Sequence, residues 1–361
     1  MAAVTAETAS TSPGEDRRYS QVRTGYTPFL DGDLLVAKIT PCFENGKIAQ
    51  ATLKHPVGFG STEFHVVRSR PGRADARYLL HFLRQDRIRR EGESTMTGSA
   101  GQRRVPERFL ADLDVPLPLL SEQRRIAEVL DRAEALRAKR RAALAQLDTL
   151  TQSIFLDMFG DPVANPRRWP DPTLGGALHF IGYGPRFYDE PYSTEGTRIV
   201  RITDLSEDGV LDFSAMPRME VSGADKEKHL LHPGDLIFAR TGATVGKVAL
   251  IRSNDPPCIA GAYFITLRFK ETLEPLYARA VLTAPSVRAI VARRSRQAAQ
   301  PNFSGPALRQ LPMPLPPTRY QREFVSRIAG VETLRAAHRA SLTQFDALFA
   351  SLQHRAFRGE L

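Results

Sequence analysis

Residues 121–157 read SEQRRIAEVLDRAEALRAKRRAALAQLDTLTQSIFLD, a stretch without proline or glycine. Its apolar residues recur every three or four positions, which is the pattern of one face of an amphipathic helix. At 1.5 Å per residue, such a helix is about 55 Å long. A helix of this length extends beyond a small domain, so its apolar face needs a second helix as a partner.

Residues 321–355 have the same pattern in the same phase. Apolar residues of the first helix match residues 198 positions later: Ile126, Ala133, Leu147 and Ile154 match Phe324, Val331, Phe345 and Leu352, while Leu136 and Leu150 match Leu334 and Leu348. A polar residue interrupts each stripe at the same level, Arg140 in the first and His338 in the second. The two stretches therefore predict a pair of antiparallel coiled-coil helices within a repeated unit.

The repeat continues before each helix. Residues 113–118 (LDVPLP) match 311–316 (LPMPLP), residues 32–38 (GDLLVAK) match 234–240 (GDLIFAR), and residues 46–49 (GKIA) match 246–249 (GKVA). Short β-branched and apolar runs bounded by turn residues predict strands in both copies. The expected fold class is α+β, with two β-rich domains separated by the two long helices.

The expected boundaries follow from this pseudo-repeat. Residues 1–18 have a polar composition without periodicity and are expected to be disordered. The first domain covers 19–120, the first helix 121–158, the second domain 166–318 and the second helix 319–357. Nothing in residues 1–31 resembles residues 196–211, so the first domain is expected to be truncated.

Composition narrows the class of protein. The chain has 361 residues, a formal net charge of +10 and a pI near 9.8, which favours a nucleic-acid partner because phosphate contacts need an excess of Lys and Arg. No apolar run is long enough to cross a membrane. The two cysteines, Cys42 and Cys258, lack metal-ligand spacing and indicate free thiols in a reducing cytoplasm.

Three motifs invite catalytic interpretations that the residues do not support. Residues 242–247 (GATVGK) have three residues between the glycines instead of the four of a phosphate loop, and no Ser or Thr follows the lysine. Residues 254–258 (NDPPC) lack the aromatic residue of an amino-methyltransferase motif. Asp33, Glu44 and Lys47 evoke a nuclease, but the second copy does not repeat the acids. We therefore expect no catalytic residue and no metal site.

What remains is a recognition surface of matched turns and polar loops. Arg, Asn and Gln suit base edges, and Lys and Thr suit phosphates, although each alone is more often an ordinary surface residue. The candidate DNA-binding residues are Lys38, Thr40, Asn45, Lys47, Gln102, Arg103 and Arg104 in the first copy, and Arg201, Arg240, Thr241, Thr244, Lys247, Gln300 and Asn302 in the second.

Together these motifs resemble the specificity subunit of type I restriction-modification systems. The resemblance rests on residues 32–47 and 234–249, on 116–127 (PLPLLSEQRRIA) and on 159–166 (FGDPVANP), and it spans nearly everything after residue 20. It implies two target-recognition domains that read the halves of a split sequence in double-stranded DNA. It also implies a non-catalytic subunit that seats two methyltransferase (modification) subunits and a restriction subunit, without contact to a membrane.

The same resemblance implies that this subunit binds no cofactor, because S-adenosylmethionine, ATP and Mg belong to its partners. Outward-facing charges on the first helix are the candidate docking residues: Arg124, Arg125, Glu128 and Arg132. Two alternatives stay open, namely a stand-alone enzyme that modifies or cleaves DNA and a degenerate scaffold without sequence preference.

Overall fold

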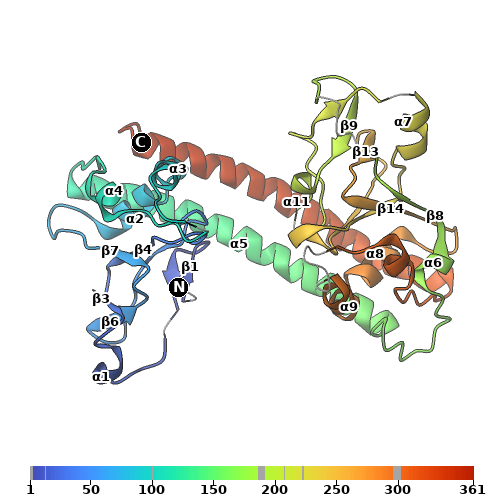
Figure 1. The fold of residues 1–361 in the computed structure, drawn as a ribbon, viewed down its shortest axis with the longest axis horizontal. Coiled ribbons are helices and arrows are strands. Elements are labelled where there is room, and N and C mark those ends of the chain that lie inside the picture. The colour runs from blue at the N-terminus through green and yellow to red at the C-terminus, as the bar shows by residue number, and fades with distance from the viewer. Residues whose placement is uncertain are drawn as a thin grey trace. The chain divides into compact units, whose positions relative to one another are not determined.

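The computed structural model describes residues 3–12, 14–99, 101–185, 192–206, 208–221, 223–295 and 302–361. Its contacts divide the chain into two compact units: residues 1–144 with 337–361 form unit 1, and residues 145–336 form unit 2. The long helices α5 (Leu120–Phe159) and α11 (Thr318–Ala356) contribute residues to both units (Figure 1). The α+β class and the two long helices predicted from the sequence are confirmed.

Unit 1 is built on a mixed sheet in the order β1-β2-β5-β4-β7. Its strands are β1 (Val4–Thr5), β2 (Ser10–Thr11), β4 (Leu34–Ala37), β5 (Ile48–Gln50) and β7 (Phe64–Val67), and β3 (Thr27–Leu30) pairs with β6 (Val57–Gly60) in a separate ribbon. The helices are α1 (Tyr19–Val22), α2 (Ala76–Leu83), α3 (Asp86–Ser94) and α4 (Glu107–Ala111). All four residues of β4 are buried, as expected for a central strand.

The N-terminus differs from the expectation of disorder over residues 1–18. Val4 and Ala9 are 4% and 3% exposed, and β2 joins the edge of the sheet in parallel with β5 at Ser10 and Gln50. The two apolar side chains are buried because the hairpin covers an open sheet edge. A local reading of composition could not find this tertiary partner.

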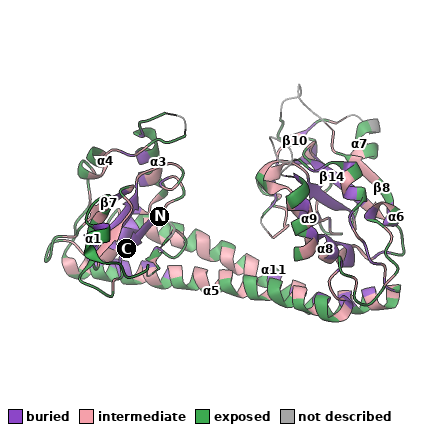
Figure 2. Cartoon of the chain, turned by 60° about the horizontal axis from the view of Figure 1, so that its bottom comes forward, coloured by how far each residue is buried: buried purple, intermediate pink, exposed green. Residues whose placement is uncertain are grey.

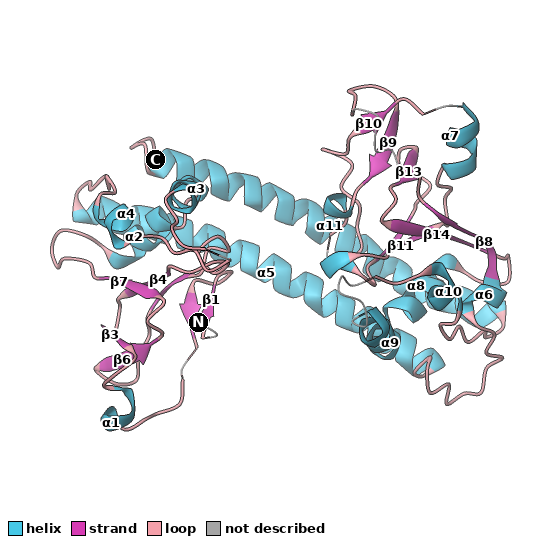
Figure 3. Cartoon of the chain, viewed as in Figure 1, coloured by secondary structure: helices cyan, strands magenta, loops and turns pink. Residues whose placement is uncertain are grey.

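Unit 2 repeats the sheet and enlarges it. The four-stranded sheet has the order β12-β11-β14-β8, and a second sheet has the order β10-β9-β13 (Figure 3). The strands are β8 (Leu178–Tyr183), β9 (Thr197–Val200), β10 (Arg218–Met219), β11 (Leu236–Ala239), β12 (Val248–Leu250), β13 (Cys258–Ala260) and β14 (Phe264–Phe269). The helical segments are α6 (Leu174–Ala177), η1 (Ile202–Asp204), α7 (Gly223–His229), η2 (Gly242–Thr244), α8 (Pro275–Thr283), α9 (Pro285–Ser295) and α10 (Gly305–Arg309).

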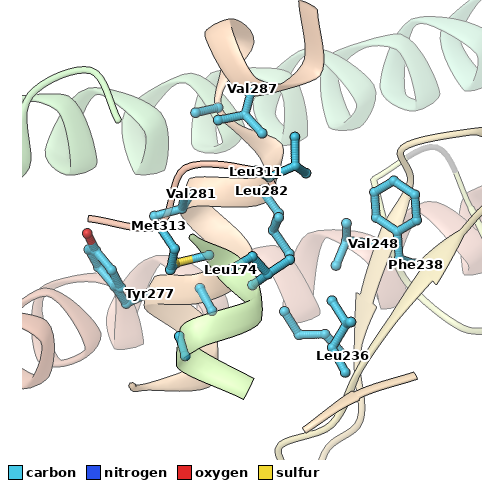
Figure 4. Packing of buried hydrophobic residues seen from close by; sticks show 14 of the residues in the cluster. Leu174, Leu236, Phe238, Val248, Tyr277, Val281, Leu282, Val287, Leu311 and Met313 are labelled. Carbon is cyan, nitrogen blue, oxygen red and sulfur yellow. The ribbon is translucent and has the colours of Figure 1, made fainter. Parts of the chain in front are cut away.

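The main core of unit 2 lies between its sheet and α8. Figure 4 shows Leu236, Phe238 and Val248 of the sheet opposite Val281 and Leu282 of α8, all of them at most 2% exposed. Burying a side chain of this size contributes about 1.5–3 kcal/mol to folding, so this cluster is a principal source of the unit's stability.

Each unit contains a pair of consecutive helices with a break between them. Residues 76–90 form α2 and the start of α3, with extended Gln85 between them, and residues 276–294 are divided between α8 and α9. In unit 2 the break has a steric cause. The ring of Pro285 disfavours helical geometry at Ala284, whose φ and ψ are −59° and 141°. The break at the same place in both copies supports the pseudo-repeat.

Buried interactions also repeat. Asp33 accepts two hydrogen bonds from Arg68, both at 2.7 Å, and Asp235 accepts two from Arg268 at 2.8 and 2.7 Å. Both aspartates are at most 2% exposed, and the bond from Arg68 holds the pKa of Asp33 below its usual value despite burial.

The long helices bury only part of the apolar stripes predicted from the sequence. Ile126, Ala133, Phe324 and Val331 are at most 9% exposed, whereas Leu136, Leu150, Leu334 and Leu348 are 44–53% exposed. Figure 2 shows exposed residues alternating with half-buried ones along the middle of α5 and α11. The contact positions Ile126, Arg137, Asp148 and Phe159 instead stand eleven apart, because a straight helix of 3.6 residues per turn drifts away from a heptad.

Charged residues occupy part of that helix contact. In unit 1, Arg137 Nε donates to Asp346 at 2.5 Å. In unit 2, Arg335 pairs with Asp148, and these two residues are the repeat counterparts of Arg137 and Asp346. Arg140 and His338, each the counterpart of the other, lie in contact with 2.9 Å between Nη1 and Nδ1.

Candidate nucleic-acid interface

In unit 1 the predicted turn and polar loop lie side by side. The turn follows β4, and its backbone forms hydrogen bonds with the loop: Thr40 N–H donates to Arg103 C=O, and Val105 N–H donates to Lys38 C=O, both at 2.9 Å. Residues 63 and 67 positions apart in the sequence are therefore adjacent at the end of the sheet. This placement brings Lys38, Thr40, Asn45, Lys47, Gln102, Arg103 and Arg104 to one region.

The side chains of this region differ in how free they are to bind DNA. Arg104 forms a bidentate pair with Glu63, at distances of 2.8–3.2 Å, which lowers the pKa of Glu63. Thr40 donates to Glu44 at 2.7 Å. By contrast, Asn45, Gln102 and Arg103 are exposed, and Arg103 lies only within 3.9 Å of Glu44. Arg104 and Thr40 are thus structural as well as candidate contact residues.

Unit 2 repeats the arrangement. Phe303 N–H donates to Arg240 C=O at 2.8 Å, and Thr241 forms a β-bridge with exposed Asn302. Thr244 Oγ1 donates to the Thr241 carbonyl at 3.0 Å, which closes the turn. Gln300, the remaining candidate of this loop, lies outside the described residues.

Arg240 has a partner that the sequence did not reveal. Its guanidinium lies 4.8 Å from the centroid of the Tyr183 ring, and the Tyr183 hydroxyl accepts a hydrogen bond from Gly305 N–H at 2.8 Å. The Nε of Arg240 is buried and has no hydrogen-bond partner among the described residues. Tyr183, 44% exposed at the end of β8, therefore orients the guanidinium by a cation–π contact. An aromatic residue ending a strand was the only signal for it.

Arg201 lies outside the turn and loop that form this cluster. It follows β9 of the second sheet, and its guanidinium donates to Asp204 at 2.7 and 3.1 Å and to Ala215 C=O at 3.2 Å. Asp204 is 5% exposed, so this pair stabilises the 3₁₀ turn at that point. The structure thus gives Arg201 a local structural role.

Lys247 lines a cavity of about 450 Å³ within unit 2. Arg279 and Arg288 line it too, while Phe155 and Phe324 contribute apolar surface. Part of its origin is the small Thr283, which replaces Arg84 of unit 1, where that arginine binds Glu134 and the Ala6 carbonyl. The glycine loop before Lys247 therefore borders a pocket that the sequence did not predict.

The candidate docking residues are exposed along the start of α5. Glu128 pairs with Arg132 at 2.5 Å, Arg125 pairs with Glu122 at 2.6 Å, and Arg124 lies 3.9 Å from Asp75. Exposed pairs of this kind are weak and exchange easily for contacts with another protein.

Among the residues that the structure describes, no group of three or more His, Cys, Asp or Glu residues is arranged to hold a metal ion. None of the helices in that part of the chain combines the length and hydropathy of a membrane crossing. Cys42 and Cys258 are free, as expected, and burial raises the pKa of the Cys258 thiol to about 12.

Comparison with known proteins agrees with this architecture. The profile of the family described as "Type I restriction modification DNA specificity domain" matches residues 26–146 and 181–344. The chain therefore belongs to this family. The crystal structure of a type I restriction-modification S subunit from M. genitalium shares the fold, with a TM-score of 0.52 and 13% identity over 91% of this chain and 83% of that one.

Two curated relatives come from Escherichia coli. The EcoAI specificity subunit is 46% identical over 113 residues, which is 31% of this chain and 19% of that protein. The EcoKI specificity subunit, from strain K12, is 25% identical over 305 residues, 79% of this chain and 65% of that protein. This chain thus aligns with less than two thirds of the length of either relative.

Proposed function

We propose that this chain is the DNA-sequence-recognition subunit of a type I restriction-modification complex. Each unit reads one half of a bipartite site in double-stranded DNA. The single observation that supports this most strongly is the matched backbone pairing of turn and loop, Lys38 with Val105 and Arg240 with Phe303. It gathers base-reading and phosphate-binding residue types at the same place in two related units.

The residues divide by role according to their surroundings. Arg240 is held by Tyr183 and suits bidentate recognition of a guanine edge. Lys38 and Lys47 suit phosphate contacts that fix register, because an ammonium group is a compact point charge. Asn45, exposed in the turn of unit 1, and Asn302, exposed in the loop of unit 2, suit an adenine edge.

The proposed complex contains further subunits. The exposed charges at Arg124, Arg125, Glu128 and Arg132 would dock methyltransferase subunits, two in the proposed assembly, and a restriction subunit would join them. S-adenosylmethionine, ATP and Mg would act in those partners, and this subunit would be non-catalytic. Its proposed place of action is the cytoplasm.

The test maps adenine methylation across the genome with and without this gene. Loss of methylation at one bipartite motif supports the proposal, and restored methylation with the wild-type gene completes the comparison. A gene carrying Arg240→Ala should restore methylation, but with relaxed base specificity at one position of one half-site. The expected loss of discrimination between bases at that position is about 1–3 kcal/mol. Arg327→Ala is the control, because that exposed arginine of unit 2 lies on α11, where it pairs with Glu323.

The alternatives predict other results. A stand-alone enzyme would modify or cleave DNA as the purified chain with magnesium or S-adenosylmethionine. A degenerate scaffold would bind partners while methylation stayed unchanged on deletion. Either result would overturn the proposed function.

A further inference from the structure

The segment that leads into each long helix has unequal surroundings in the two units. In unit 2, Leu311 and Met313 are 0% exposed. In unit 1 their counterparts Leu113 and Val115 are only half-buried, and farther along Leu117 and Leu119 are 47% and 81% exposed. α10 of unit 2 contains buried residues, and the corresponding α4 of unit 1 contains none.

In unit 2 the segment 170–183 covers the residues that lead into α11. Leu174 N–H donates to Leu311 C=O at 2.8 Å, and Leu315 N–H donates to Pro170 C=O at 2.7 Å. Leu174 and Ala177 of α6 are 0% and 2% exposed within the main core of the unit. The segment then continues as β8 and extends the sheet.

β8 pairs with β14 in antiparallel fashion, with Gly182 opposite Thr266 and Phe180 opposite Arg268. The sheet of unit 1 ends at β7, the counterpart of β14, and no strand in the described part of the chain lies on its outer edge. Lys38 N–H donates to Glu63 C=O, so alternation directs the peptide groups of His65 and Val67 toward β4 and those of Val66 outward. Val66 therefore presents a donor and an acceptor to an added strand.

Arg68 of unit 1 is also exposed where an added strand would lie. In unit 2, Arg268 lies 5.6 Å from the centroid of the Phe180 ring while it binds Asp235. In unit 1, Arg68 makes the same bond to Asp33, but its side chain is 57% exposed, compared with 32% for Arg268. An aromatic residue at the position of Phe180 would cover Arg68.

We propose that the β7 edge of unit 1, together with residues 107–119, is an acceptor site for a segment of a separate polypeptide. That segment has the pattern of residues 170–183: a one-turn helix with apolar residues at the positions of Leu174 and Ala177, followed by a strand. It adds antiparallel to β7 by β-augmentation. The added segment comes from a polypeptide other than a second copy of this chain, because each copy buries its own residues 170–183 in the core of unit 2.

The test uses the full-length chain and a fluorescein-labelled peptide of residues 170–185, PDPTLGGALHFIGYGP. Fluorescence anisotropy should show saturable binding, and hydrogen exchange at the Val66 amide should slow when the peptide is bound. Val66→Pro removes the outward N–H, and Leu117→Asp places a charge on the acceptor site. Each should weaken binding about tenfold or more.

The control is Leu348→Asp, a leucine of unit 1 that is also 47% exposed but lies on α11. It should change affinity by less than about twofold. A second peptide, with Asp in place of Leu174 and Leu178, should not bind. Absent saturation, equal binding of the two peptides, or an unchanged affinity in both acceptor variants would overturn the proposal. A dimer of the chain that protects Val66 without peptide would also overturn it, by assigning the edge to a second copy.

Discussion

Gln123 and Gln321, 198 positions apart, make the same three hydrogen bonds. Oε1 of Gln123 accepts from Asp75 N–H at 2.9 Å, and its Nε2 donates to the carbonyls of Arg73 and Pro118 at 3.0 and 2.8 Å. Gln321 is bonded in the same way to Glu274 N–H and to the carbonyls of Thr272 and Pro316, at 2.9, 3.1 and 2.7 Å. Both glutamines are 0% exposed. Each side-chain amide connects the start of a long helix to the start of a helix in the same unit, α5 to α2 and α11 to α8.

Gln123→Ala should therefore destabilise unit 1, because it removes a buried amide that bonds one N–H and two C=O groups. The expected loss is about 1–3 kcal/mol in the free energy of unfolding. Hydrogen exchange resolved by residue should show faster exchange in α2 and little change in α8. Gln146→Ala, an exposed glutamine of α5, is the control. Equal stability of the Gln123 and Gln146 variants would contradict the role assigned to the buried amide.

Asp131 should make unit 1 sensitive to acid. Burial raises the pKa of Asp131, but hydrogen bonds from His81 and Arg77 outweigh that effect and hold it at about 2. Because the folded pKa is depressed, the stabilisation is present above about pH 4 and is lost as the pH falls toward 2. The side chain is 36% exposed, so solvent screening limits the effect to about 1 kcal/mol.

The measurement compares unfolding of wild type and Asp131→Ala between pH 6 and pH 2.5. Alanine is the chosen substitution because Ala329 occupies the corresponding position in unit 2. The variant should be less stable than wild type at pH 6, because buried His81 has lost its Asp131 partner. The difference in the free energy of unfolding between the two proteins should become smaller as the pH falls. A gap independent of pH would show that Asp131 does not act through its charge.

Arg335→Met should strongly destabilise unit 2. The Arg335 side chain is 6% exposed and pairs with both Asp148 and Glu332, and the charge of Arg335 helps to keep the pKa of Glu332 low against the opposing effect of burial. Removal of one member of a buried ion cluster costs about 3–5 kcal/mol. Arg327→Met removes an exposed pair with Glu323 and should cost less than about 1 kcal/mol. Denaturant titration distinguishes the two, and similar losses would refute the assignment.

Lys47 and Arg104 should contribute unequally to DNA affinity. Lys47→Ala should weaken binding similarly for all sequences and reduce the slope of log affinity against log salt by about one. Arg104→Ala should have a smaller effect on the slope, because Glu63 already neutralises that guanidinium. Binding of a double-stranded oligonucleotide at several salt concentrations checks both. A larger change for Arg104 would mean that the Glu63 pair opens when DNA binds.

The sequence could predict the repeat because its signals are local. Glycine–aspartate before a buried strand and proline before a helix recur at nearly fixed spacing, and both mark backbone geometry. The same spacing placed the turn at Lys38 and the loop at Arg103 in equivalent positions, and the structure shows that they meet.

The remaining features depend on contacts that spacing does not encode. Arg104 is neutralised by Glu63, which lies 41 positions away. Tyr183 reaches Arg240 only because β8 pairs with β14. The hairpin of residues 4–11 has a composition typical of disorder, and it folds because it finds an open strand edge.

The contact between Arg140 and His338 bears on the history of the chain. The ion pairs Arg137–Asp346 and Arg335–Asp148 would both form in a symmetric dimer of identical half-length ancestors, since each is the image of the other. At the self-matched position, however, such a dimer would place arginine against arginine or histidine against histidine. An arginine that donates to a histidine nitrogen requires two different sequences. A single chain that carries both halves can hold different residues at this position, and the Arg140–His338 contact disfavours association of two identical halves.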